Sequence, residues 1–95
     1  MTTHIERITD GSTGEYRATL EGSDATAKLS WTERGGVRHA EHTFVPPEFR
    51  GKGVAAELVK ALIEDAREQG FTIAPDCSYV ESYFDRHKEL AELRA

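Results

Sequence analysis

With 95 residues the chain has room for one small domain, and we expect residues 1–95 to form it without a second folding unit. The composition, 38% hydrophobic and 31% charged, is typical of a globular protein and excludes a disordered chain. The 17 acidic side chains outnumber the 12 basic ones, and the resulting formal net charge of −5 argues against nucleic-acid binding, which usually requires a basic surface.

The first half of the chain is predicted to form four strands, at residues 5–8, 15–21, 25–33 and 37–45. Turn sequences at residues 10–14, 21–24 and 34–36 separate them. Alternation in the second and third strands places one set of apolar side chains on a single face: Tyr16, Ala18, Leu20, Ala25, Ala27, Leu29 and Trp31. In the fourth strand, alternation places Val37, His39, Glu41, Thr43 and Val45 on one face, and Arg38, Ala40, His42 and Phe44 on the other. Four such strands in succession predict an antiparallel meander.

The hydrophobic period then changes from that of a strand to that of a helix. Apolar residues spaced as on a helix face run from Val54 to Ala66, and Gly70 follows where a helix commonly ends. Residues 71–75 are a short strand candidate, expected to lie parallel to the fourth. Ser78 and Glu81 have the spacing of a capping box, which would start a helix through about residue 88, and the charged tail at residues 89–95 is expected to fray. The sequence therefore predicts an α+β fold: an antiparallel four-stranded meander followed by helix, strand and helix.

The segment Arg50-Gly51-Lys52-Gly53-Val54-Ala55 joins the fourth strand to the first helix and is the most informative stretch of the chain. The first amides of a helix have no internal partner, and the helix dipole makes that end partly positive. Small residues let an anion approach the backbone closely, so the segment suits a phosphate or pyrophosphate, with charge from Arg50 and Lys52 beside it. The alternative interpretation is an ordinary glycine-rich loop before a helix.

Two known phosphate-binding motifs fit this segment less well. A Walker loop requires serine or threonine after its lysine, whereas Gly53 follows Lys52. The dinucleotide fingerprint is matched by Gly51, Gly53 and Ala56, with Asp76 at a possible ribose-binding position. However, residues 46–50 separate the strand from the first glycine, where that fingerprint needs a tight turn, and only one strand–helix–strand unit is present.

Residues 45–55 resemble the acetyl-CoA signature of the GNAT superfamily of N-acetyltransferases. The core of that signature, Q/R-x-x-G-x-G/A, is matched by Arg50, Gly53 and Ala55. Within the superfamily the chain is similar to a group of very small single-domain proteins, through HTFVP at residues 42–46, PDCSYV at residues 75–80 and His87. The resemblance covers roughly residues 37 to 90 and departs from that group at Lys88, where we would expect proline.

The resemblance implies acetyl-CoA as co-substrate and an amine as acceptor, with no metal ion. It implies that backbone groups around Phe44 and Val45 pair with the pantetheine arm as an added strand would. It implies further that the pyrophosphate is held by the amides of Gly51, Lys52, Gly53, Val54 and Ala55. The acetyl thioester would then lie between the fourth and fifth strands, near Cys77. Many larger relatives begin with extra helices that shape the acceptor site, whereas this chain starts with a strand.

Amide formation from a thioester requires a base, because an amine is protonated at neutral pH and must lose its proton to react. His42 and Glu41 lie on the fourth strand beside the expected thioester and are predicted to point to opposite faces. The resemblance to the small group favours His42, whereas many larger relatives use a glutamate of this strand. The alternative for Glu41 is a solvated strand residue.

Cys77 follows the fifth strand and precedes a helix, a position that can lower the pKa of a thiol. It is interpreted either as a residue that accepts the acetyl group transiently, paired with His42 or His87, or as part of the wall of the thioester pocket. Larger relatives use a tyrosine of the last helix as the acid for the departing thiolate. Tyr83 is the candidate here, but the spacing does not separate it from Tyr79, and core packing is the alternative for at least one of them.

The acceptor is expected to be an amine of a small molecule or of a protein. No nucleic acid, membrane or metal is expected as a partner, and the sequence gives no indication of oligomeric state. The single cysteine, the polar start of the chain and the lack of a long apolar stretch favour the cytoplasm. Two other hypotheses remain: a CoA-binding module without efficient turnover, and a nucleotide-binding or protein-interaction domain of the same architecture.

Overall fold

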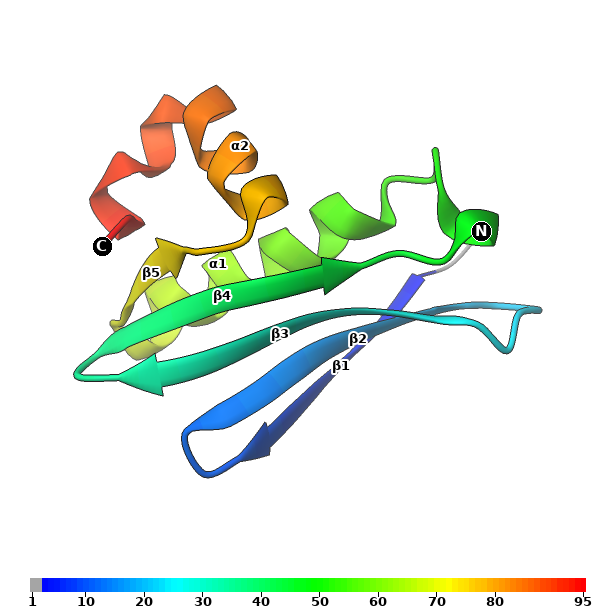
Figure 1. Ribbon diagram of the computed structural model, residues 1–95, viewed down its shortest axis with the longest axis horizontal. Coiled ribbons are helices and arrows are strands. Elements are labelled where there is room, and N and C mark those ends of the chain that lie inside the picture. Colours follow the sequence, from blue (N-terminus) through cyan, green and yellow to red (C-terminus); the bar gives the residue numbers. More distant parts are fainter. Residues whose placement is uncertain (1–2) are drawn as a thin grey trace.

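The computed structural model describes residues 3–95, and its elements follow the predicted order (Figure 1). The strands are β1 (Thr3–Asp10), β2 (Thr13–Leu20), β3 (Thr26–Arg34), β4 (Val37–Phe44) and β5 (Thr72–Pro75). The α-helices are α1 (Val54–Gln69) and α2 (Ser78–Arg86), and two 3₁₀ helices, η1 (Pro47–Phe49) and η2 (Lys88–Leu93), complete the described elements. The α+β prediction is confirmed.

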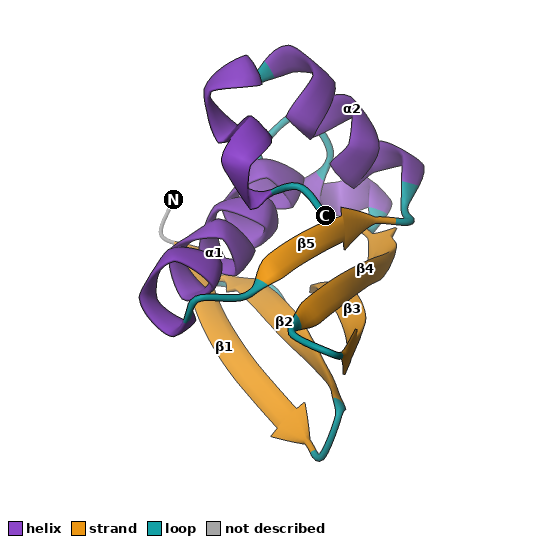
Figure 2. Ribbon diagram, turned by 90° about the vertical axis from the view of Figure 1, so that its left-hand side faces the viewer, coloured by secondary structure: helices purple, strands orange, loops and turns teal. Residues whose placement is uncertain are grey.

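The strands form one sheet in the order β1-β2-β3-β4-β5. Neighbouring strands from β1 to β4 are antiparallel, and β5 is parallel to β4 because α1 carries the chain back across the sheet. One face of the sheet is buried beneath α1 (Figure 2), through the alternating residues Tyr16, Ala18, Leu20, Ala27, Leu29 and Trp31. The opposite face, called the outer face below, carries Lys28, Ser30 and Thr32 of β3 and is covered by no helix in the described part of the chain.

Helix α1 buries the residues that its periodicity predicts, among them Val54, Leu58 and Leu62. It ends at Gly70, which has φ 82° and whose amide donates to the carbonyl of Ala66 at 2.8 Å. A non-glycine residue would be strained there, so the predicted C-cap glycine is confirmed. None of the helices that the structure describes is long and apolar enough to cross a lipid bilayer.

The predicted faces of β4 are wrong beyond Ala40. Ala40 pairs with Trp31 and His42 pairs with Ser30, so Glu41 is an extra residue without an opposite partner, a β-bulge. An extra residue reverses the alternation, because side chains in a strand point to opposite faces with a period of two. Ala40 therefore lies on the buried face while His42 and Phe44 lie on the outer face.

The end of the chain differs from two predictions. Cys77, not Ser78, is the N-cap of α2, and no side chain makes a capping hydrogen bond, so the predicted capping box does not form. Helix α2 ends at Arg86, and the tail does not fray in this structure. Arg94 pairs with Asp85 at 3.0 Å, and the amide of Ala95 donates to the carbonyl of Ile73 at 2.7 Å. These contacts hold the last residues against α2 and β5, whereas the charged composition alone predicts a tail that remains in solvent.

Candidate functional site

Strands β4 and β5 separate part of the way along the sheet. Their pairing runs from Val37 with Thr72 to Ala40 with Pro75, and then β5 ends. The chain turns at Asp76, and the amide of Cys77 donates to the carbonyl of Ala40 at 2.8 Å before α2 begins. Strand β4 continues to Phe44, so its edge beyond Ala40 has no strand beside it among the described elements. This open edge can pair with an extended ligand as an added strand would.

The loop between β4 and α1 is shaped by buried Phe49 and by two glycines. Phe49 ends η1 and is 1% exposed, which anchors the loop to the core. Gly51 and Gly53 follow with φ of 78° and 73°, in the left-handed region that other residues seldom adopt. A Cβ atom built on either glycine would meet nothing within 4 Å, so the space on the side where a side chain would lie is open at both positions.

Gly53 is the N-cap of α1 and contributes no capping side chain. The first hydrogen bond inside the helix runs from the amide of Glu57 to the carbonyl of Gly53, at 3.2 Å. The amides of residues 54–56 therefore have no partner within the helix, and the positive end of the helix dipole lies at the same place. A helix N-terminus of this kind can accommodate an anion such as a phosphate group.

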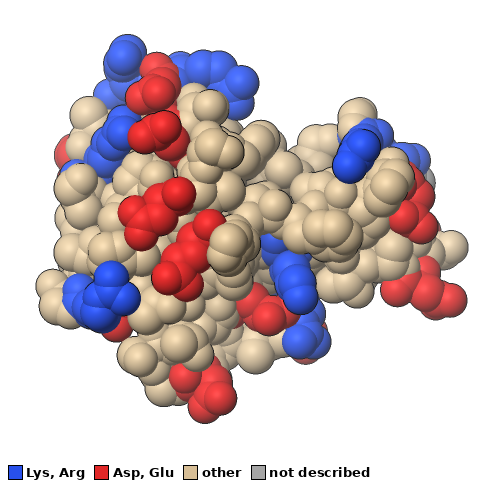
Figure 3. Space-filling view, in the orientation of Figure 1, with Lys and Arg blue, Asp and Glu red and all other residues tan. Residues whose placement is uncertain are grey.

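A cleft of about 270 Å³ lies at the start of α1, between Val45, which directly follows β4, and Tyr79 of α2. In the space-filling view the surface is hollowed between the part formed by α2 and the part formed by the loop (Figure 3). The cleft is lined by Val45, Phe49, Arg50, Gly51, Gly53, Val54, Ala55, Ala56 and Tyr79. Six of the eight predicted cofactor residues are thus brought to one cleft: Val45, Arg50, Gly51, Gly53, Val54 and Ala55.

The other two predicted cofactor residues, Lys52 and Phe44, do not line this cleft. The ring of Phe44 is 52% exposed on the outer face, where it lies in a hollow with Thr26 and Lys28. Only its backbone, at the end of β4, remains in a position to meet a ligand in the cleft. The bulge explains this difference, because it turns the Phe44 side chain away from the buried face.

Cys77 lies opposite the open part of β4. Its Sγ is 3.3 Å from Oγ1 of Thr43, which the bulge places on the same side of β4 as Ala40. Burial by itself would raise the pKa of the Cys77 thiol, but Thr43 and the first amides of α2 favour the thiolate and together lower the pKa. Cys77 is therefore a partly buried thiol with an increased tendency to ionise.

The predicted Cys–His pair is absent from the described residues. Nδ1 of His87 is 2.7 Å from the carbonyl oxygen of Tyr83, and the His87 ring stacks on the Tyr83 ring with centroids 4.1 Å apart. Both side chains line a different hollow, between α1 and the end of α2. Tyr79, one turn earlier on α2, lies in the cleft itself, so the geometry favours Tyr79 over Tyr83 as the tyrosine nearest to a bound ligand.

His42 and Glu41 lie on the same face, not on opposite faces as predicted. His42 is exposed and pairs with Ser30, an outer-face residue. Oε1 of Glu41 accepts a hydrogen bond of 3.0 Å from the hydroxyl of Thr32, which is also on the outer face. The bulge brings both side chains to one side, next to the open edge of β4.

A pair that sequence reasoning missed lies beside them. Nδ1 of His39 is 2.9 Å from Oδ2 of Asp76, which comes just before Cys77. The alternation of β4 places His39 on one face with Glu41 but indicates no role for it, and the sequence indicates Asp76 only as a possible ribose-binding residue. Their contact depends on the parallel register of His39 with Ala74, and no spacing in the sequence indicates that register.

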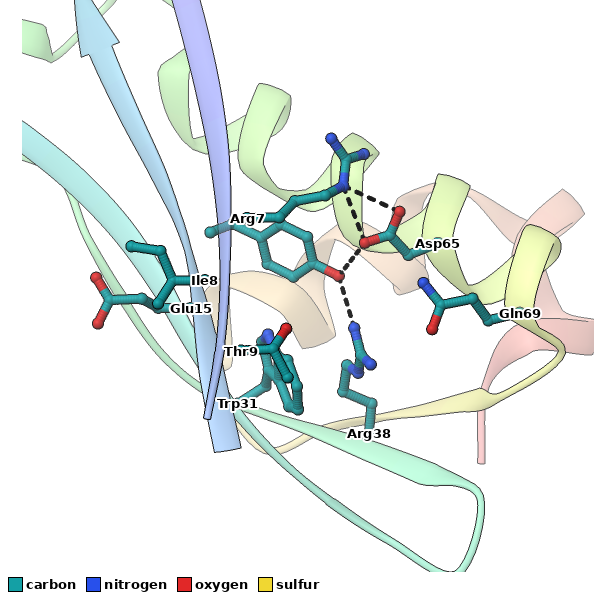
Figure 4. Close-up of a pocket in the computed structure, with 9 residues that line it drawn as sticks. Arg7, Ile8, Thr9, Glu15, Trp31, Arg38, Asp65 and Gln69 are labelled. Carbon is teal, nitrogen blue, oxygen red and sulfur yellow. Dashed lines mark hydrogen bonds and ion pairs between the residues drawn. The ribbon is translucent and has the colours of Figure 1, made fainter. Parts of the chain in front are cut away.

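Another hollow, of about 160 Å³, lies elsewhere on the sheet, beside the end of α1 (Figure 4). The Tyr16 hydroxyl donates to Asp65 at 2.8 Å, Arg7 contacts both oxygens of Asp65, and Arg38 donates to the Tyr16 hydroxyl at 2.9 Å. Arg38 also contacts Glu33. The two buried charges of this cluster, Arg38 and Asp65, both have partners, as stable burial requires, so the cluster links the sheet to α1.

Comparison with known proteins gives one match that covers most of the chain. The model of a family described as GCN5-related N-acetyl-transferase matches residues 15–93. That range contains the loop, the start of α1, the open edge of β4 and Cys77.

Proposed function

Because the chain belongs to the GCN5-related N-acetyltransferase family, we propose that it transfers the acetyl group of acetyl-CoA to an amine. The observation that supports this proposal best is the cleft at a helix N-terminus without a capping side chain, beside Val45, which follows the open edge of β4. These features suit the two polar parts of CoA, its pyrophosphate and the amide-containing pantetheine arm. Arg50 adds positive charge to the same cleft.

Acetyl-CoA, when bound, supplies an activated acyl group whose thiolate leaves more readily than an amine would. In this proposal the amides of residues 54–56 hold the pyrophosphate, and the edge of β4 aligns the arm toward Ala40. The thioester then lies in the gap between β4 and Cys77. His42 takes a proton from the attacking amine, and Tyr79 is the candidate donor to the departing sulfur.

The proposal is tested by two measurements on the wild-type protein. Calorimetric titration with acetyl-CoA, CoA and NAD should show binding of the first two and none of NAD. Thiol release from acetyl-CoA should then accelerate when amines are added, because the amine is the second substrate. Binding without amine-dependent turnover would instead favour a CoA-binding module, and failure to bind either thioester or thiol would remove the proposal.

We expect Cys77 to line the pocket without forming an acetyl-enzyme. A lowered pKa makes its sulfur more nucleophilic at neutral pH, but no histidine contacts it to take and return protons. Incubation with acetyl-CoA should therefore leave the mass of the protein unchanged, and Cys77→Ala should retain substantial activity. An added acetyl mass in the wild type that is missing from Cys77→Ala would instead establish a covalent intermediate.

A further inference from the structure

The pair formed by His39 and Asp76 lies where β4 and β5 separate, on the opposite side of the sheet from the buried core. Asp76 reaches back to His39 because its amide donates to the carbonyl of Ala74 at 3.0 Å, in a turn that immediately precedes Cys77. The side chain of the next residue, Cys77, points to the other face, since its sulfur contacts Thr43. Two consecutive residues thus place a carboxylate on the outer face and a thiol on the other side of the gap.

The chemistry of the pair is fixed by its hydrogen bond. A carboxylate only accepts hydrogen bonds, so Nδ1 of His39 carries the proton and Nε2 holds a lone pair. The His39 side chain is 22% exposed and that of Asp76 is 55% exposed, so both solvent and a ligand can reach the pair.

The surroundings of the pair suit a cation. Glu41, the extra residue of the bulge, lies two residues after His39 on β4 and on the same face. Thr32 is the register partner of His39 on β3. Arg34, opposite Val37, is the other charged side chain next to it on β3, and β5 contributes only the neutral Ala74 and Thr72. Two carboxylates therefore flank the imidazole at the mouth of the gap.

We propose that the acceptor is a cationic alkylamine that arrives from the outer face, and that the His39–Asp76 pair removes the proton of its ammonium form. This inference rests on the proposed acetyl transfer. The ammonium proton passes to Nε2 of His39, leaving a neutral amine and an imidazolium. The amine nitrogen then attacks the thioester carbonyl carbon, and the carbon–sulfur bond breaks. His42 takes up the second N–H proton. The departing thiolate receives one proton, for which Tyr79 is the candidate donor, so these two protons balance. The imidazolium returns its proton to water, so that the reaction releases one proton in total.

The test compares two acceptors that differ in ionisation. A lysine-like alkylamine is almost fully protonated at pH 7, because its pKa is about 10.4, whereas an O-alkylhydroxylamine of the same length is neutral. His39→Asn keeps a donor in the position of Nδ1 but has no base. We expect this variant to lower kcat/KM for the alkylamine at least about tenfold, the low end for loss of a general base, and to leave the O-alkylhydroxylamine close to wild type. The defect should shrink as the pH approaches the pKa of the alkylamine.

Two comparisons complete the test. His4→Asn makes the same substitution on the outer face of β1 and should change neither rate. Equal losses for both acceptors in His39→Asn would overturn the proposal, because they would mean that the pair only supports the turn before Cys77. A measurement without turnover separates this failure from failure of the acetyl transfer itself: NMR shifts on adding the alkylamine to the CoA complex should centre on His39 and Asp76. Shifts centred on another surface would contradict the inference whether or not the protein turns over.

Discussion

Replacing Gly53 with valine should lower the affinity for CoA at least about tenfold while the protein remains folded. Gly53 precedes the free amides of α1, and a branched side chain there would occupy the side from which a phosphate must approach. Charge-assisted hydrogen bonds are worth about 1.5–3 kcal/mol each, and about 1.4 kcal/mol corresponds to tenfold in affinity, so loss of one such contact is sufficient. Calorimetric titration with CoA measures the effect.

The variant also has a cost in stability that must be separated from the loss of binding. Gly53 has φ 73°, and a β-branched residue held there is strained by about 1–3 kcal/mol even though nothing stands within 4 Å of its Cβ. Gly11→Val is the matched control, because Gly11 has φ 64° and the same open surroundings but lies in the turn between β1 and β2. Both variants should lose similar stability, and only Gly53→Val should lose affinity. Unchanged CoA binding by a folded Gly53→Val protein would remove the assignment of this cleft to CoA.

The elements that local pattern determines were predictable from the sequence. The alternation of Tyr16 with Ala18, and of Leu29 with Trp31, indicates a half-buried sheet whatever its partners are. Gly70 ends α1 for a reason internal to the helix, namely the need for positive φ. Most of the cleft was predictable for the same reason, because the loop and the helix N-terminus that form it are contiguous in the chain.

What was missed depends on register between strands distant in sequence. A bulge at Glu41 has no signature in β4 itself, since it exists only relative to Ser30 and Trp31 on β3. That single insertion decides which side of the sheet His42 and Phe44 occupy. The contact of His39 with Asp76 likewise requires the parallel register of β4 and β5, two strands that α1 separates along the chain.

The structure of the tail, residues 89–95, also depends on contacts with residues distant in the sequence. Its charges suggested that it would stay in solvent, yet Arg94 pairs with Asp85 of α2 and bridges to Ile73 of β5. Charge composition describes the average preference of a segment, whereas these partners are specific residues brought near by the fold. The hydrogen bond from Ala95 to Ile73 also covers part of the edge of β5, which would otherwise be open.

His42→Gln should lower kcat/KM at least about tenfold for every amine that is a substrate, the low end of the ~10²–10⁴ that a general base contributes. Glutamine keeps the size and hydrogen bonding of histidine but cannot take the proton. His42 is exposed on the outer face beside the open edge of β4, whereas the amides proposed to hold the pyrophosphate begin at Val54, so CoA affinity should change little. The measurements are steady-state kinetics and CoA titration of the variant beside wild type.

The pH dependence and a matched control separate proton transfer from a structural effect. A base acts when deprotonated, so with the O-alkylhydroxylamine, which does not depend on His39, wild-type kcat/KM should rise with pH, and His42→Gln should lose that rise. His4→Gln makes the same change on the outer face of β1 and should retain both the rate and the rise. Because His42 is expected to act on the neutral amine, its loss should affect alkylamine and O-alkylhydroxylamine alike, unlike the loss of His39. Wild-type kcat/KM in His42→Gln, with the rise intact, would show that another group removes this proton, and Glu41 beside the same open edge is the next carboxylate to test.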